Sequence, residues 1–348
     1  MWLTDSFQKY TLRALARLPE PAMRPLAGAP IRHEGQQLHA VAQLLNRFAP
    51  QGTPPDSDPE TLARMRDDTE THASWLAPWA NRLIEAEDIA LPGAEGARPA
   101  RLYRPAQLSR PGPALLYFHG GGHVMGSIRS HDGICRALAG DGGLRVISYD
   151  YRLAPEHPFP AGIEDCIAAF RGLAARAGDH GIDPARIAVG GDSSGANCAA
   201  VVTQTCRTDR PAPAFQLLFV PWLDLASKHN SYELFGRGFM LEESWIDWFA
   251  DLYLNGADAS DPRVSPLYGN LAGLCPALVM TAGFDPLRDE AEAYAAGMRR
   301  AGVEVEHVRA EGMTHAFLSF SGGIPAARAL LQQSALRLAD ALNVAETA

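Results

Sequence analysis

From about residue 84 onward, short β-rich runs alternate with segments of helical periodicity, and this alternation restricts the fold more than any other feature of the chain. Most runs after residue 113 are apolar almost throughout, as is typical of strands buried on both faces of a parallel sheet. The alternation predicts a doubly wound α/β sheet. The predicted strands are 84–91, 100–103, 114–118, 144–149, 186–189, 216–220, 277–281 and 303–308. The predicted helices between and after them are 131–141, 161–177, 195–208, 287–301 and 324–343.

Two segments lack this alternation. Residues 1–80 contain no convincing strand, and their apolar side chains recur at helical spacing, which predicts helices outside the sheet. Residues 224–271 are rich in aromatic side chains and are too long for a simple connection. We therefore expect N-terminal cap helices in 1–80, a cap insertion in 224–271, and a catalytic domain formed by 81–223 together with 272–348.

A serine stands at the apex of a predicted strand–turn–helix unit. Gly191, Ser193 and Gly195 follow the apolar run 186–190 and precede an alanine-rich stretch. This pattern is the Gly-x-Ser-x-Gly elbow, which exposes a serine hydroxyl above a sheet. Glycine is needed at 191 and 195 for steric reasons, because the turn strains the backbone and brings neighbouring elements close together. Ser193 is therefore the predicted nucleophile.

A serine hydroxyl needs a base, usually a histidine, and a carboxylate that orients this base. In hydrolases with such an elbow, the order along the chain is serine, acid, histidine. Asp285 and His315 each come directly after a predicted strand, so both fall at the strand ends where open α/β sheets build their sites. Asp289 and Glu290 lie farther along, in the next predicted helix. Asp285 is therefore the predicted acid and His315 the predicted base.

Three consecutive glycines follow the predicted strand 114–118, in the run His119–Gly122. Glycines let backbone amides point inward without obstruction by side chains. We expect the amides of Gly121, Gly122 and Ser194 to hold the negative oxygen of a tetrahedral intermediate, which is worth about 3 kcal/mol per donor. A glycine-rich turn also suits phosphate, but no Gly-Lys-Ser/Thr sequence follows this one. We expect His119 to orient the loop through a hydrogen bond to the backbone.

Taken together, these motifs make the chain similar to the hormone-sensitive-lipase-like family of α/β hydrolases, over about residues 80 to 340. The motifs are His119–Gly122, Tyr151–Pro160, Gly191–Gly195, Asp285–Asp289 and Gly312–His315. The resemblance implies an α/β-hydrolase fold, with an eight-stranded, mostly parallel sheet, helices on both faces and a helical cap. It also implies a serine carboxylesterase that hydrolyses short- to medium-chain esters without a cofactor or a metal.

The chain departs from the family pattern at three positions, one of which is the minor change to Ala316 where glycine is common. Ser194 replaces the alanine that usually follows the nucleophile, and we expect its hydroxyl to enter the substrate pocket. His123 replaces the aromatic residue that usually follows the glycine run and helps to wall this pocket. In the cap, Phe239, Met240 and Trp248 are the other predicted substrate-binding residues. We also expect Asp192 to form local hydrogen bonds that stiffen the elbow.

The composition restricts partners and location. A formal net charge of −9 argues against nucleic acid as a partner. No run of 18 or more apolar residues occurs, so we expect no stable membrane insertion. Five scattered cysteines are typical of reduced core thiols, which predicts a cytoplasmic protein. The expected partner is a small-molecule ester substrate, and a homodimer is left open.

Other activities also remain open at this stage. The same three catalytic side chains serve amidases and peptidases, and the sequence does not exclude these. A ligand-binding homologue that has lost catalysis is disfavoured, because His315 is present. A lipase for long acyl chains is also disfavoured, since no large apolar lid is evident in the sequence.

Overall fold

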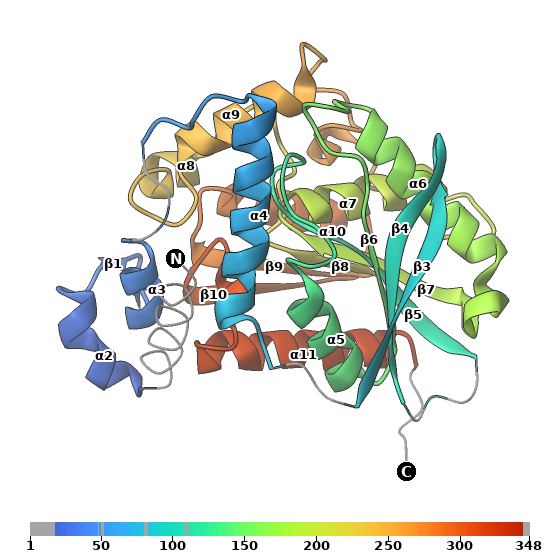
Figure 1. Cartoon of the computed structure of the whole chain (residues 1–348), viewed down its shortest axis with the longest axis horizontal. Helices are drawn as coiled ribbons and strands as arrows, with labels where there is room; N and C mark the ends of the chain where they lie inside the picture. The colour runs from blue at the N-terminus through green and yellow to red at the C-terminus, as the bar shows by residue number, and fades with distance from the viewer. Residues whose placement is uncertain are drawn as a thin grey trace.

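The structure is a computed structural model, and it describes residues 18–343 apart from 48, 50, 51, 80–82, 107, 109 and 110. An eight-stranded sheet with the order β10-β9-β8-β7-β5-β6-β4-β3 forms its middle layer (Figure 1). The strands are β3 (Ile84–Gly93), β4 (Gly96–Pro105), β5 (Gly112–Phe118), β6 (Arg145–Tyr149), β7 (Ile182–Asp192), β8 (Gln216–Phe219), β9 (Ala277–Phe284) and β10 (Val305–Thr314). β4 runs antiparallel to its neighbours β3 and β6, while the other neighbouring strands are parallel. This confirms the predicted eight-stranded, mostly parallel sheet.

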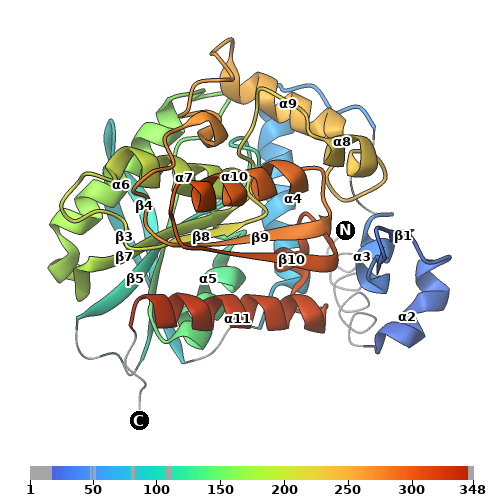
Figure 2. The ribbon, with the colours of Figure 1, turned by 180° about the vertical axis from the view of Figure 1, so that it is seen from behind.

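Helices cover both faces of this sheet (Figure 2). One face carries α5 (Asp132–Gly142) and α11 (Pro325–Ala341), and the other carries α6 (Ala161–Ala175), α7 (Ser194–Cys206) and α10 (Arg288–Arg300). Side chains of a strand point alternately to the two faces. In β5, Leu116 packs into the core beneath α6 and α7, whereas Leu115 packs into the core beneath α5 and α11. Both are fully buried, which explains why the strands of the central sheet are apolar almost throughout.

The N-terminal region contains helices, as predicted, but also a small hairpin. The helices are α2 (Glu20–Ala27), α3 (Ala40–Leu45) and α4 (Pro59–Leu76). Between the first two, β1 (Arg32–His33) pairs with β2 (Gln36–Gln37) in antiparallel fashion, so the prediction of no strand in this region was wrong. Glu34 and Gly35 both have positive φ angles, 50° and 79°, as a two-residue hairpin turn of type I′ requires. Residues 1–17, which belong to the region predicted to be helical, lie outside the described residues.

The segment 224–271 forms α8 (Asn230–Phe235), α9 (Glu243–Leu254) and the short 3-10 helix η2 (Pro266–Tyr268). It contacts the N-terminal region directly, since Ser244 Oγ donates to the carbonyl of Gly52 at 2.8 Å and the Asn46 side chain donates to that of Gly238 at 3.3 Å. Figure 1 shows α8 and α9 at one end of the molecule, beside α4. In the described part of the chain, no helix combines the length and the apolar character that a membrane span requires.

Candidate active site

Ser193 lies between the last residue of β7 and the first residue of α7, at the apex of a sharp turn. Its φ of 55° and ψ of −122° are unusual for a residue with a side chain, and such strain concentrates at functional sites. The two flanking glycines allow the turn to approach β5. A Cβ at either Gly191 or Gly195 would collide with the carbonyl oxygen of Phe118. The sequence therefore folds into the predicted elbow because both positions lack a side chain.

Ser193, His315 and Asp285 form a continuous chain of hydrogen bonds. The Nε2 atom of His315 is 2.9 Å from Ser193 Oγ, and its Nδ1 atom is 2.9 Å from Asp285 Oδ2. Asp285 directly follows β9, and His315 directly follows β10, so neighbouring strand ends hold the two side chains together. This is the arrangement in which a carboxylate orients an imidazole against a serine hydroxyl.

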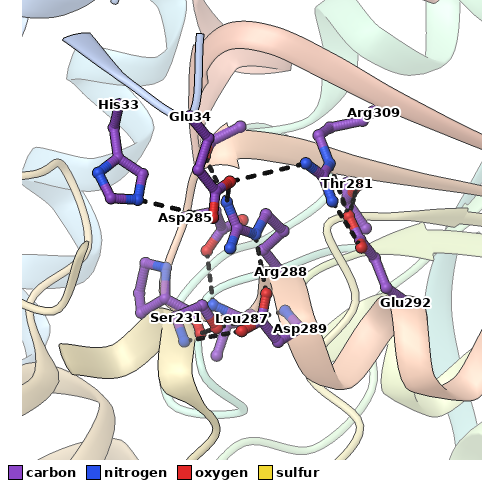
Figure 3. A network of polar contacts seen from close by, with 12 residues as sticks. His33, Glu34, Ser231, Thr281, Asp285, Leu287, Arg288, Asp289, Glu292 and Arg309 are labelled. Carbon is purple, nitrogen blue, oxygen red and sulfur yellow. Dashed lines mark hydrogen bonds and ion pairs between the residues drawn. The ribbon is translucent and has the colours of Figure 1, made fainter. Parts of the chain in front are cut away.

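The second oxygen of Asp285 is also held. Its Oδ1 atom accepts the backbone amide of Leu287 at 2.9 Å, a contact drawn in Figure 3. The carboxylate is 1% exposed, whereas the imidazole of His315 is 11% exposed and reaches the cavity described below. Asp285 is thus fixed on both oxygens and shielded from water. Asp289 instead pairs with Arg288 and accepts the amide of Ser231 in the cap. Glu290 accepts the amide of Leu223.

The loop after β5 contains the three consecutive glycines 120–122 and is called the glycine loop here. It leaves two backbone amides available. Gly121 and Gly122 have φ angles of 123° and 63°, and in the described part of the chain their amides donate to no protein group. The carbonyl of Gly121 accepts the amides of Val124 and Met125, which closes the loop into a turn. Ser194 is the first residue of α7, and an amide at that position has no acceptor within its own helix.

The side chain of Ser194 lies where sequence reasoning did not place it. It is fully buried and does not line the cavity, so the expectation that its hydroxyl enters the substrate pocket was wrong. The cause is the direction of the helix: the first turn of α7 points this side chain toward the interior of the protein. The backbone amide is unaffected by this orientation.

A buried polar cluster supports the glycine loop from below. The Asp192 carboxylate accepts the hydroxyl of Tyr117 at 2.6 Å and the amide of Gly120 at 3.2 Å, and His131 Nε2 lies 3.2 Å from it. The contacts of Asp192 therefore extend well beyond the elbow, not only locally as expected. His119 Nδ1 lies 3.0 Å from the carbonyl of Gly120, in the orienting role that the sequence predicts.

The charges in this cluster stabilise each other. Burial alone lowers the pKa of His131, but the facing Asp192 carboxylate and its hydrogen bond outweigh this effect and raise the pKa above 6.5. Burial alone raises the pKa of Asp192, but the charge of His131 and the hydrogen bonds from His131 and Tyr117 lower it below 3.8. Burial lowers the pKa of His119 to about 4, so this imidazole is neutral at neutral pH.

Comparisons with known proteins agree with this geometry. A family model described as alpha/beta hydrolase fold matches residues 115–319. The carboxylic ester hydrolase LipN of Mycobacterium tuberculosis is 41% identical over 323 residues, which cover 88% of this chain and 84% of that protein. The chain belongs to the α/β-hydrolase family. The resemblance to hormone-sensitive-lipase-like carboxylesterases inferred from the motifs is thereby confirmed.

Other proteins that are similar to this α/β hydrolase are also named as ester hydrolases or esterases. The ethyl acetate hydrolase of Pseudomonas putida is 41% identical and covers 66% of this chain and 75% of its own length. Among solved structures, the hyperthermophilic esterase of Pyrobaculum calidifontis is 36% identical, with a TM-score of 0.80, and the alignment covers 86% of this chain and 97% of that one. The thermostable carboxylesterase EstE1, cloned from a metagenomic library, is 40% identical, with a TM-score of 0.76 and coverage of 81% and 97%.

In this α/β hydrolase, a cavity of about 210 Å³ opens beside Ser193 and His315. The glycine loop forms one of its walls. Apolar side chains form most of the rest, and they come from the cap and from the loops after β8 and β9 and near η3 (Phe317–Phe320). They include Trp222, Leu241, Ile246, Phe249, Leu287 and Leu318.

None of the four predicted substrate-binding side chains lines this cavity. His123 is 2% exposed, and its ring stacks on that of Tyr253 in α9 at 3.9 Å between centroids. Its φ of 61° turns the chain at this position, and the side chain lies in the core. Phe239 and Met240 pack on the core beneath β9, and Trp248 packs against the core of the opposite face.

Instead, the cap contributes Leu241, Ile246 and Phe249, which were not among the four predicted substrate-binding residues. Ile246 and Phe249 are three residues apart on α9, so they share one face of that helix. A Cβ at Gly122 would collide with the ring of Phe249, which shows how closely the helix covers the glycine loop. The sequence shows that residues 224–271 are rich in aromatic side chains, but which side chains meet the cavity depends on the tertiary packing.

Proposed function

We propose that this chain is a serine carboxylesterase that hydrolyses short- to medium-chain carboxylic esters through an acyl-enzyme at Ser193. It is an ester-hydrolysing enzyme of the α/β-hydrolase family, as its relatives' names and their identity over most of the chain indicate. The single observation that carries the assignment of residues is the hydrogen-bonded chain Ser193–His315–Asp285, with 2.9 Å at each link.

The proposed reaction begins when Ser193 Oγ attacks the ester carbonyl while His315 Nε2 takes its proton. The carbonyl oxygen becomes negatively charged, and the amides of Gly121, Gly122 and Ser194 stabilise it. The imidazolium then gives its proton to the departing alcohol, which leaves an acyl group on Ser193. Water, activated by the same imidazole, attacks this acyl group and releases the carboxylic acid.

Asp285 holds the imidazole of His315 in the tautomer whose Nε2 atom accepts the serine proton. It also stabilises the imidazolium while the proton resides there. The second hydrogen bond, from the amide of Leu287, limits rotation of the carboxylate. Every step is completed by groups of this chain, the ester and water.

The cavity size supports small acyl groups. Sites for drug-sized ligands have volumes of about 300–1,000 Å³, and the cavity beside Ser193 has about 210 Å³. Its apolar walls suit an alkyl chain, because burial of each CH₂ group contributes about 0.8 kcal/mol. We infer that Leu241, Ile246 and Phe249 contact the substrate.

We also propose the division into N-terminal cap helices, a cap insertion and a catalytic domain at the boundaries given above. A cytoplasmic location is likewise a proposal, supported by five cysteines that are all unpaired. A homodimer stays a prediction that sedimentation would test.

The first test compares p-nitrophenyl butyrate and p-nitrophenyl palmitate as substrates of wild type, Ser193→Ala and Ser260→Ala. Ser260 is an exposed serine of the cap segment, far along the chain from the elbow, and serves as the matched control. We expect butyrate turnover in wild type and Ser260→Ala and its loss in Ser193→Ala. Turnover retained in Ser193→Ala would contradict the nucleophile, and faster turnover of palmitate than of butyrate would contradict the substrate size. A butyryl anilide tested in parallel separates an esterase from an amidase.

A further inference from the structure

The N-terminal hairpin lies against the strand ends that carry Asp285 and His315. β2 contacts β10, and the amide of His39, two residues after the hairpin, donates to the carbonyl of Gly312 at 2.9 Å. His39 and Gly312, which are 273 positions apart in the chain, thus meet next to the triad. This hairpin is separate from the cavity, and the mechanism proposed above does not use it.

The ladder between β9 and β10 is interrupted where the hairpin docks. Ala310 pairs with Ala282, and the next recorded pair is Thr314 with Phe284. Three residues of β10, 311–313, therefore face the single residue Gly283 of β9. A break of this kind leaves backbone groups of both strands without their usual ladder partners. Because the break lies two residues before Asp285 and two to four residues before His315, it weakens the sheet where the geometry of these two side chains is set.

The side chain of Gln36 fills this break. Its Nε2 atom donates to the carbonyl of Gly283 at 3.1 Å, and its Oε1 atom accepts the amide of Gly312 at 3.0 Å. One primary amide thus replaces one peptide unit between the two strands. Gln36 is 7% exposed. The space is closed around it, since a Cβ at Gly283 would collide with the Gln36 amide.

A second contact fixes the hairpin to the first residue of α10. Figure 3 shows Glu34, at the hairpin turn, directed toward Arg288, and the Glu34 carboxylate lies 2.8 Å from Arg288 Nη1. Arg288 in turn pairs with Asp289 at 2.8 Å, and Asp289 accepts the amide of Ser231 in the cap. Arg288 is buried, whereas the Glu34 side chain is 42% exposed, so water screens this ion pair from the Glu34 side.

We propose that Gln36 is a positioning residue of the triad, whose side-chain amide holds the ends of β9 and β10 at the separation that Asp285 and His315 require. The inference rests on the proposed function of this triad. Gly283 precedes Asp285 by two residues, and Gly312 precedes His315 by three. A carbonyl needs a donor and an amide needs an acceptor, and glutamine supplies both at once.

The test is a set of three variants. Gln36→Met keeps the length and unbranched shape of the side chain and removes both hydrogen bonds. Gln36→Glu keeps an acceptor for Gly312 and places a carboxylate oxygen against the carbonyl of Gly283. Gln37→Met is the matched control, because Gln37 is the neighbouring residue of the same type, and its side chain binds Arg32 on the exposed side of the hairpin.

The readouts are kcat and KM for p-nitrophenyl butyrate, with kcat expressed per serine titrated by a fluorophosphonate. We expect Gln36→Met to lower kcat about tenfold to a hundredfold, because small misplacements of catalytic groups have effects of this order. KM should stay within about twofold, since the cavity is untouched. Gln36→Glu should lower kcat at least as much as Gln36→Met, because it sets a carboxylate oxygen against the Gly283 carbonyl in a buried space. Gln37→Met should behave as wild type. Equal kcat per titrated site in Gln36→Met and Gln37→Met would overturn the proposal, even if Gln36→Met had a lower Tm.

The rate of fluorophosphonate labelling separates this proposal from the proposed function, because labelling needs the triad but no ester turnover. If wild type is labelled yet hydrolyses no ester, the carboxylesterase assignment fails. Gln36 is then judged on the labelling rate alone: slower labelling of Gln36→Met than of Gln37→Met supports positioning, and equal rates overturn it. If wild type is not labelled at all, both proposals are overturned.

Discussion

His131 and Asp192 form a buried ion pair directly beneath the glycine loop, with 3.2 Å between His131 Nε2 and the carboxylate. Asp192 also accepts the amide of Gly120, so the pair is connected to the loop by its backbone. Asp192, which is adjacent to the nucleophile Ser193 in the chain, therefore supports the glycine loop on the opposite wall of the site. Because a buried charge without its partner is costly, each member of the pair depends on the other.

The stability of the protein should depend on pH through this pair. The raised pKa of His131 means that its contribution is complete below 6.5 and is lost as pH rises through the higher folded-state pKa. The lowered pKa of Asp192 means that its contribution is present above 3.8 and is lost as pH falls. We expect Asp192→Asn to lower the free energy of unfolding by about 3 to 5 kcal/mol at about pH 6, and by less at about pH 9. Urea unfolding at both pH values checks this, and an equal loss at both would contradict it.

The contribution of Glu290 to stability should change with pH in the opposite direction to that of Asp192. Glu290 is buried, and its Oε1 atom accepts the amides of Leu223 at 2.6 Å and Asp224 at 3.1 Å. Burial raises its pKa well above 4.5, outweighing these hydrogen bonds. Its contribution to stability is complete below 4.5 and is lost as pH rises through the raised pKa. Glu290→Gln keeps an acceptor and should reduce the decline in the free energy of unfolding as pH rises above 4.5, measured by urea titration. A decline as steep as that of wild type would refute this.

Gly122→Ala should inactivate the enzyme. The added methyl group would collide with the ring of Phe249, and a φ of 63° disfavours any side chain. Displacement of an oxyanion donor lowers kcat by about 10² to 10³. Gly238→Ala is the control, because Gly238 has a φ of 76° but open space around its Cα. It should cost about 1 to 2 kcal/mol in stability, with kcat unchanged. Similar kcat values for the two variants would argue against the role of the loop.

Phe249→Leu should shift the acyl-chain preference toward longer chains. Phe249 lines the cavity, whereas Phe239 packs on Phe235 and Phe284 outside it, so Phe239→Leu is the matched control. Contacts of one or two methylene groups change specificity about tenfold. We expect the ratio of kcat/KM for octanoate to that for butyrate to rise in Phe249→Leu only. The same shift in both variants would mean that the cap acts indirectly.

Much of this fold was predictable because it is encoded locally. Each of the eight predicted strands overlaps a strand of the sheet, since apolar runs bounded by turn residues leave few alternatives. The triad was predictable from the same strand pattern. Its three side chains stand directly after parallel strands, and the carboxyl ends of such strands meet at one edge of the sheet.

Other features were not predictable because they depend on tertiary contacts. His123 follows a glycine run in the position of a pocket residue, but its positive φ and the ring of Tyr253 place it in the core. The hairpin at Glu34 and Gly35 has only two residues per strand, too few for an alternating pattern. The only local feature that favours a turn there is a glycine between polar residues. The residues that Gln36 contacts lie far from it in the sequence, so the sequence around Gln36 does not indicate its role.

The contact between Gln36 and Gly312 spans 276 residues, whereas the elbow around Ser193 is formed by residues that are adjacent in the chain or in neighbouring strands. Closing so long a loop carries a large entropic cost that later contacts must offset. The nucleophile can therefore take its strained conformation while the ends of β9 and β10 still lack their bridge. Among partly folded states of this chain, those with a formed elbow but an undocked hairpin would contain every catalytic residue and still lack the alignment between acid and base.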